Sequence, residues 1–264
     1  MGDLLEDILE DIVGTDELTE LETWRAALAE FVATLGFVFL GSAAVVTSFI
    51  VFGGTGDLTP ERLIIIAMGH GFAIAVLVWA TAHISGGHIN PVVTAAAFVT
   101  GKIKFLKGAL YVLGQLGGAI CAAFLLKAVL PNSEENGLGA HALSAAMKDE
   151  SAGLAVLLEA ILTFLLVFVV FAVAVDRRGP GNLAPLAIGM IFMLGHFAGY
   201  PLTGASMNPA RTLGPAWAAD QWADHWIYWA GPMGGGILAA VVYQLVFAQR
   251  GEEEGEAESE AEAA

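Results

Sequence analysis

Long runs of apolar residues, separated by Gly, Pro and charged residues, make up most of the chain. Each run is long enough for a helix to cross the roughly 30 Å hydrocarbon layer of a bilayer, which takes about 20 residues. The runs do not alternate between apolar and polar positions, so a transmembrane β-barrel is disfavoured. The pattern predicts an all-α membrane protein with six transmembrane helices, at about 24–52, 63–83, 105–130, 151–175, 183–200 and 225–248.

Two further apolar segments, at about 90–99 and 208–217, are too short to cross a bilayer. Each begins with an Asn-Pro pair, Asn90-Pro91 in the first and Asn208-Pro209 in the second. A backbone that does not span the membrane is tolerated at membrane depth where it is buried in protein or lines a water-filled cavity. We therefore expect both segments to be re-entrant half-helices.

The two halves of the chain, at about 24–130 and 151–248, repeat each other at a nearly fixed offset. Pairs that match at an offset of 117 or 118 include Gly86 and Gly204, Asn90 and Asn208, Pro91 and Pro209, Tyr111 and Tyr228, and Gly118 and Gly235, and Glu30 is echoed by Glu159. Each half contains three crossings and one half-helix. Because three is odd, the second half enters from the opposite face, so the repeat is inverted and the half-helices dip in from opposite sides.

Charge changes this picture only at the ends of the chain. The 264 residues carry a formal net charge of −16, yet residues 1–23 hold nine acids, residues 251–264 hold seven, and neither stretch has a Lys or Arg. We expect 251–264 to be a disordered acidic tail. The apolar positions within 1–23 have helical spacing and predict an amphipathic helix. Acidic ends either solvate a protein at high salt, as in halophilic prokaryotes, or bind a basic partner, and they do not attract nucleic acid.

The basic residues near the span ends predict the orientation. Most lie on the side that carries both termini, namely Arg25, Lys102, Lys104, Lys107, Arg177, Arg178 and Arg250, whereas Arg62, Lys127 and Lys148 lie on the other side. This bias predicts that both termini are cytoplasmic, and we expect a multi-pass protein of the cell (plasma) membrane.

Two loops carry a family resemblance. Ser85-Gly86-Gly87-His88-Ile89-Asn90-Pro91-Val92 and Thr203-Gly204-Ala205-Ser206-Met207-Asn208-Pro209-Ala210-Arg211 resemble the signature loops of the aquaporin (major intrinsic protein) family. The resemblance covers nearly everything except the acidic ends. It implies an aquaporin-like fold with a channel domain at 24–250, a homotetramer with one pore per subunit, and passage of water. Val92 stands where the family usually has Ala, and we expect it to narrow the constriction.

The chemistry of the Asn-Pro pairs can also be argued directly. Asn is a preferred helix N-cap and Pro suits the first helical position. If the side-chain oxygen of Asn90 or Asn208 accepts a backbone N–H, its NH₂ group can donate into a pore. The two half-helix N-termini, each with about half a positive charge, would repel cations, and a water molecule held by both amides would interrupt a proton wire.

The resemblance places the narrow filter of the family at His70, His196, Ala205 and Arg211. His196 resembles the filter histidine of water-selective members. His70 stands where those members usually have Phe, and it resembles some plant vacuolar members that pass more than water. Thr212 replaces the Asp typical of glycerol channels. A water channel, a channel for glycerol, ammonia or a similar neutral solute, and a secondary transporter therefore remain as hypotheses.

Two acids, Glu30 and Glu159, lie within apolar spans, where a carboxylate is costly without partners. Proton relay is one interpretation. We favour a structural one, in which each carboxylate accepts backbone N–H groups from a re-entrant loop.

The sequence has no pattern that indicates an enzyme. Gly53-Gly54-Thr55-Gly56 lacks the Lys of a phosphate-binding loop and is interpreted as a turn. His83, His88, His141 and His225 have no metal-ligand spacing. We expect no cofactor and no metal, and the partners to be water or a small neutral solute and the lipid bilayer.

Overall fold

The computed structural model describes residues 10–53 and 57–248, and every regular element within them is a helix. In chain order the elements are η1 (Asp16–Thr19), α2 (Leu21–Val51), α3 (Pro60–Ser85), α4 (Pro91–Val99), α5 (Phe105–Val129), η2 (Gly137–Gly139), α6 (Ala145–Lys148), α7 (Ala152–Val170), η3 (Phe171–Val175), η4 (Gly181–Leu183), α8 (Ala184–Thr203), α9 (Pro209–Ala219), α10 (Ile227–Val242) and η5 (Tyr243–Phe247). The helices α2, α3, α5, α7 with η3, η4 with α8, and α10 with η5 are long and apolar enough to span a bilayer, which confirms the six predicted spans.

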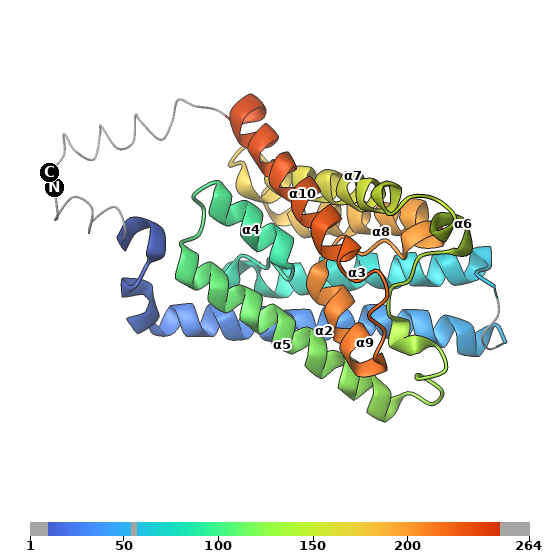
Figure 1. The fold of residues 1–264 in the computed structure, drawn as a ribbon. Helices are drawn as coiled ribbons and strands as arrows, with labels where there is room; N and C mark the ends of the chain where they lie inside the picture. The colour runs from blue at the N-terminus through green and yellow to red at the C-terminus, as the bar shows by residue number, and fades with distance from the viewer. Residues whose placement is uncertain (1–9, 54–56, 249–264) are drawn as a thin grey trace, which may run out of the picture.

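The two Asn-Pro segments form the short helices α4 and α9, as predicted. Both lie inside the bundle and approach its centre from opposite ends (Figure 1). Gly86 (φ 87°) ends α3 and Gly204 (φ 86°) ends α8, each in the left-handed conformation that glycine adopts without steric cost. These turns lead the chain back toward the membrane centre instead of out into solvent.

The long helices pack in two matching sets. Helix α2 packs against α5 and α3, and α7 packs in the same way against α10 and α8. The half-helix α9 of the second half lies beside α5 of the first, and α4 lies beside α10. The predicted inverted repeat is therefore present, with each half holding the half-helix of the other.

Glycines at equivalent positions of the two halves allow close contacts between the long helices. A Cβ atom at Gly118 on α5 would lie 2.3 Å from the carbonyl oxygen of Phe31 on α2. A Cβ at Gly235 on α10 would lie 1.9 Å from the carbonyl oxygen of Ala160 on α7. Such small-residue faces let membrane helices approach closely without a hydrophobic driving force between them.

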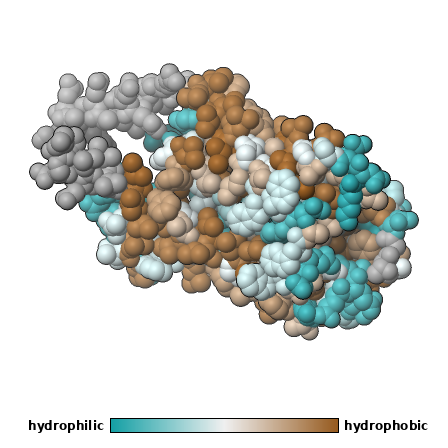
Figure 2. Space-filling model, in the orientation of Figure 1, coloured by the Kyte–Doolittle hydropathy of each residue, from teal (hydrophilic) through white to brown (hydrophobic). Residues whose placement is uncertain are grey.

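The surface agrees with a protein that crosses a membrane. Figure 2 shows hydrophobic residues along the sides of the bundle, while hydrophilic residues gather at the end that carries the loops following α2, α5 and α9. The start of α2 and the end of η5 both lie at the opposite end of the bundle (Figure 1). There Lys104 pairs with Asp16 at 3.3 Å.

Some predictions fall outside the described residues. These are the acidic tail 251–264, the first nine residues of the acidic N-terminal segment, Arg250, and residues 54–56 of the glycine-rich turn. Residues 10–13 of the N-terminal segment are helical. The short elements η2 and α6, in the connection between the two halves, were not predicted from the sequence.

Candidate functional site

The two asparagines cap the two half-helices from inside the bundle. The Asn90 side-chain oxygen accepts the Val92 N–H at 2.9 Å. The Asn208 side-chain oxygen accepts the N–H groups of Ala210 at 3.0 Å and Arg211 at 3.3 Å. Pro91 and Pro209 occupy the first helical positions, where a missing N–H has no consequence.

Each asparagine also reaches across to the other half. The Asn90 amide nitrogen donates to the carbonyl oxygen of Met207 at 2.8 Å, and that of Asn208 donates to the carbonyl oxygen of Ile89 at 2.9 Å. These bonds bring the N-terminal ends of the half-helices α4 and α9 together at one point. An amide nitrogen carries two hydrogens, so each asparagine retains one N–H beyond this bond.

The residues that accept these bonds have a strained backbone. Ile89 (φ 55°) and Met207 (φ 51°) are both in the left-handed region, which is disfavoured for residues with a Cβ and costs roughly 1–2 kcal/mol each. This conformation turns each carbonyl toward the opposite asparagine and each N–H toward a buried glutamate. Local strain of this kind persists only where surrounding contacts determine the backbone.

Glu30 holds the first re-entrant loop. Its carboxylate accepts the N–H of His88 at 2.8 Å and of Ile89 at 2.6 Å. The Ser85 hydroxyl donates to it at 2.6 Å and the Gln115 amide at 2.8 Å. With four donors, the fully buried carboxylate is compensated.

Glu159 holds the second loop in the same way. It accepts the N–H groups of Ser206 at 2.9 Å and Met207 at 3.0 Å, and the Thr203 hydroxyl at 2.7 Å. The Tyr228 hydroxyl then donates to the Thr203 carbonyl at 2.8 Å. Both loops are thus fixed through a carboxylate from the first long helix of their own half.

The four residues of the candidate filter come from three helices and one loop, and all four are fully buried. The rings of His70 on α3 and His196 on α8 are stacked, with centroids 4.2 Å apart. Arg211 on α9 donates from Nε to His70 Nε2 at 3.0 Å and from Nη1 to the Gly139 carbonyl at 2.8 Å. Ala205 lies in the second re-entrant loop, in contact with Gly199 of α8.

The backbone partners of the histidines assign their tautomers. His70 Nδ1 lies 2.8 Å from the Ile66 carbonyl oxygen, and His196 Nδ1 lies 3.1 Å from that of Phe192. Since a carbonyl only accepts, Nδ1 carries the hydrogen in both rings, and each Nε2 is an acceptor. Among the described residues, His196 Nε2 and Arg211 Nη2 have no hydrogen-bond partner. The filter therefore offers one unused acceptor and one unused donor to a small molecule.

One methyl group of Val92 packs between helices. A Cβ atom placed at Gly236 on α10 would lie 2.1 Å from Val92 Cγ1, so this methyl group occupies the space that Gly236 leaves. Val92 is fully buried and does not line the cavity described next. Its larger side chain is accommodated between helices.

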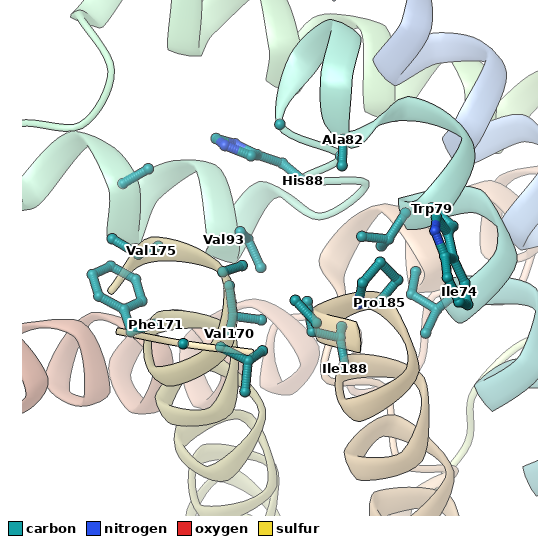
Figure 3. A pocket seen from close by; sticks show the side chains of 18 of the residues that line it. Ile74, Trp79, Ala82, His88, Val93, Val170, Phe171, Val175, Pro185 and Ile188 are labelled. Carbon is teal, nitrogen blue, oxygen red and sulfur yellow. The ribbon is translucent and has the colours of Figure 1, made fainter. Parts of the chain in front are cut away.

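A cavity of about 590 Å³ leads from the end of the bundle that holds η3 to Asn90 and Phe192. Its polar lining residues are His83, His88, Asn90, Asp176, Arg177 and Asn182. Val93, Val170 and Ile188 form an apolar wall from three different helices (Figure 3). Beyond Asn90, the filter side chains are fully buried, and the rings of His70 and His196 pack against each other.

Comparison with known proteins agrees with this geometry. Residues 17–243 match the family model of the major intrinsic protein. The chain is 45% identical over 231 residues to the maize (Zea mays) aquaporin TIP4-4, covering 87% of this chain and 89% of that one. The chain belongs to the major intrinsic protein (aquaporin) family. Mouse (Mus musculus) aquaporin-4 is 44% identical over 226 residues, covering 85% and 68% of the two chains.

The fold of this major intrinsic protein is also found in a solved structure. The X-ray structure of the aquaglyceroporin from Plasmodium falciparum matches with a TM-score of 0.73 at 22% identity, covering 85% of this chain and 96% of that one. The chain is accordingly a passive membrane channel for water or small solutes, and not an enzyme.

Several residues that hold the site of this major intrinsic protein were not predicted from the sequence. Gly139 holds Arg211 through its carbonyl, which leaves no signature in the sequence. His141 Nδ1 bonds the Thr212 hydroxyl at 2.8 Å, and Gln115 bonds both Glu30 and Thr94. A polar residue inside an apolar span, such as Gln115, is the one signal that could have pointed to this network.

Proposed function

We propose that the chain conducts water across a membrane while it excludes protons and ions. The observation that carries this proposal is the crossed pair of hydrogen bonds, from Asn90 to the Met207 carbonyl and from Asn208 to the Ile89 carbonyl. These bonds bring the positive ends of α4 and α9 to one point. Each helix end carries about half a positive charge, which opposes the passage of cations.

The lengths of the half-helices support a meeting point near the membrane centre. Helices α4 and α9 contain 9 and 11 residues. At about 1.5 Å per residue they extend roughly 14 and 16 Å, which together match the hydrocarbon thickness of about 30 Å. A water molecule that accepts from both remaining asparagine N–H groups turns its own hydrogens outward, so a continuous proton wire is interrupted.

The filter supports water as the main cargo and ammonia as the second candidate. His196 Nε2 and Arg211 Nη2 are the unused acceptor and donor, and both molecules can donate and accept one hydrogen bond. Glycerol is less favoured, because its carbon backbone needs an apolar wall and three of the four filter side chains are polar. The role of Glu30 and Glu159 in this proposal is structural, since each accepts two backbone N–H groups from a re-entrant loop.

The placement of the protein in its membrane is part of the same proposal. We propose a cell-membrane location with both termini in the cytoplasm, because Lys102, Lys104 and Arg178 lie at the end of the bundle where α2 begins. A homotetramer follows from the resemblance to the family. The acidic ends support solvation at high salt in a prokaryotic host.

A vesicle experiment tests the function. Purified protein is reconstituted at known density, and shrinkage under osmotic shock is followed by light scattering while an internal dye reports pH. We expect fast shrinkage without added proton leakage. Equal shrinkage rates with and without protein would remove the channel proposal, and flux that depends on an ion gradient would favour a secondary transporter.

A further inference from the structure

Gly41 on α2 lies directly against the filter residue His70. A Cβ atom at position 41 would be 2.6 Å from His70 Cδ2 and 2.7 Å from His70 Nε2. Protein Cβ atoms do not approach other heavy atoms this closely, so the observed ring position requires a residue without a side chain at 41. One of these two atoms, Nε2, accepts a hydrogen bond from Arg211.

The His70 ring has little freedom to move elsewhere. Phe37 meets it edge-on with centroids 6.0 Å apart, and Ile66 holds its Nδ1. The ring of His196 stacks on it, at a centroid distance of 4.2 Å. A side chain at 41 would therefore displace the ring from this closely packed position and disturb the hydrogen bond between Nε2 and Arg211.

The second group that accepts a hydrogen bond from Arg211, the Gly139 carbonyl, belongs to a residue that packs against the same part of α2. Gly139 (φ 71°) packs against Ser42, whose Cα would be 3.3 Å from a Cβ at position 139. The carbonyl of Gly139 accepts from Arg211 Nη1 at 2.8 Å. The two residues that accept from the guanidinium, His70 and Gly139, thus pack against two successive residues of α2, Gly41 and Ser42. Helix α2 itself contributes no side chain to the filter.

We propose that Gly41 is a positioning residue that sets the width of the filter. By leaving room for the His70 ring, it keeps Nε2 on Arg211 and holds both side chains back from the passage. This inference rests on the proposed function for its effect on flux, and on geometry alone for its effect on His70.

The test compares Gly41→Ala with Gly36→Ala, both in reconstituted full-length protein. Gly36 lies on the same helix, and a Cβ there would meet only the flexible side chain of Leu77, at 3.2 Å. We expect Gly41→Ala to lower water flux per channel by about tenfold, the scale of one extra methylene in a tight site. Gly36→Ala should match the wild type.

A second background separates positioning from a general packing defect. In His70→Ala protein the ring is absent, so adding Gly41→Ala should change neither water flux nor folded yield. If the Gly41→Ala protein folds only when His70→Ala is also present, that result also supports the contact between the two residues. Loss of flux or of folding in both backgrounds would overturn the proposal.

A readout independent of flux keeps the two proposals apart. The ¹⁵N chemical shift of His70 Nε2 reports its hydrogen bond with Arg211. We expect this signal to change in Gly41→Ala and to remain unchanged in Gly36→Ala; an unchanged signal in both overturns the inference. If the wild type conducts no water while the shift still responds, the proposed function fails and the role of Gly41 stands.

Discussion

Asn90 donates its side-chain amide to the carbonyl oxygen of Met207, 117 residues away, at 2.8 Å. The inverted repeat supplies the equivalent bond from Asn208 to Ile89, at 2.9 Å. Each asparagine therefore caps its own half-helix and also joins the opposite loop. One residue type connects the two halves at the point where their helix ends meet.

Replacing Asn208 by Asp should weaken both this connection and cation exclusion. The carboxylate can still accept N–H groups at the helix start, but it cannot donate to Ile89. The lost bond and unsatisfied carbonyl should cost about 1–3 kcal/mol of unfolding free energy. The negative charge should also offset the positive helix ends and admit cations. Vesicles loaded with a pH or sodium dye would then report leakage above that of the wild type.

Asn136→Asp is the matched control for this change. The Asn136 amide also donates to a backbone carbonyl, that of Asn132 at 3.2 Å, but in an exposed loop. This variant should retain the wild-type exclusion of ions. Equal leakage in both variants would contradict a special role for Asn208.

Glu159→Gln distinguishes a structural carboxylate from a proton relay. Glutamine keeps one acceptor oxygen. Its NH₂ group, however, would face N–H and O–H donors that bind the carboxylate in the wild type. We expect the unfolding free energy in detergent to fall by about 1–3 kcal/mol, with proton flux unchanged. The exposed substitution Glu22→Gln should leave stability unaltered. Changed proton flux at unaltered stability would instead favour the relay.

Val92→Ala tests where the larger side chain of this position lies. Because Val92 Cγ1 fills the space beside Gly236, its removal should leave a cavity between helices. Removal of two buried methyl groups should cost roughly 1–3 kcal/mol, while water flux stays the same. Val76→Ala, on a residue that is 63% exposed, serves as control. A clear rise in flux would show that Val92 does narrow the passage.

His70→Phe should shift the preference among neutral solutes. Phenylalanine removes the acceptor that holds Arg211 Nε and makes the filter less polar. We expect passage of ammonia to fall relative to water, as measured by paired stopped-flow experiments on one vesicle preparation. His83→Phe, at a residue that lines the cavity but is not part of the filter, should keep the wild-type ratio. An unchanged ratio in His70→Phe would remove His70 as a determinant.

Acid should loosen a cluster at the cavity mouth. Asp176 accepts from the Arg178 side chain and from the Tyr243 hydroxyl, and Arg178 Nη2 also donates to the Phe247 carbonyl at 2.7 Å. The hydrogen bonds from Arg178 hold the pKa of Asp176 well below its usual range. A lowered pKa means that this contribution to stability is complete above the ordinary pKa of about 4 and is lost as pH falls through the folded-state value.

Asp176→Asn should therefore be less stable than the wild type at pH 7, and the difference should shrink as the pH is lowered below about 4. Thermal unfolding in detergent over this range measures it. Asp149→Asn, in the loop on the opposite side, should show no such convergence. A difference that is constant with pH would exclude titration of Asp176 as its source.

The sequence by itself determined the class of the fold. A span needs about 20 apolar residues because the hydrocarbon layer has a nearly fixed thickness. The positions of the spans can therefore be predicted from the long apolar runs in the sequence. The Asn-Pro signals and the internal repeat also located both half-helices and named Asn90, Asn208, Glu30 and Glu159, because N-caps and intramembrane acids are recognisable from local residue type.

Only the tertiary structure decided how the site is held. Arg211 is fixed by a backbone carbonyl at Gly139 and by His70, 141 residues away, and neither bond has a local signature. The direction of the Val92 side chain depended on a glycine in another helix. The room for His70 depended on Gly41, because side-chain positions follow from packing between helices that are distant in the chain, whereas helix formation follows from the bilayer and from nearest neighbours.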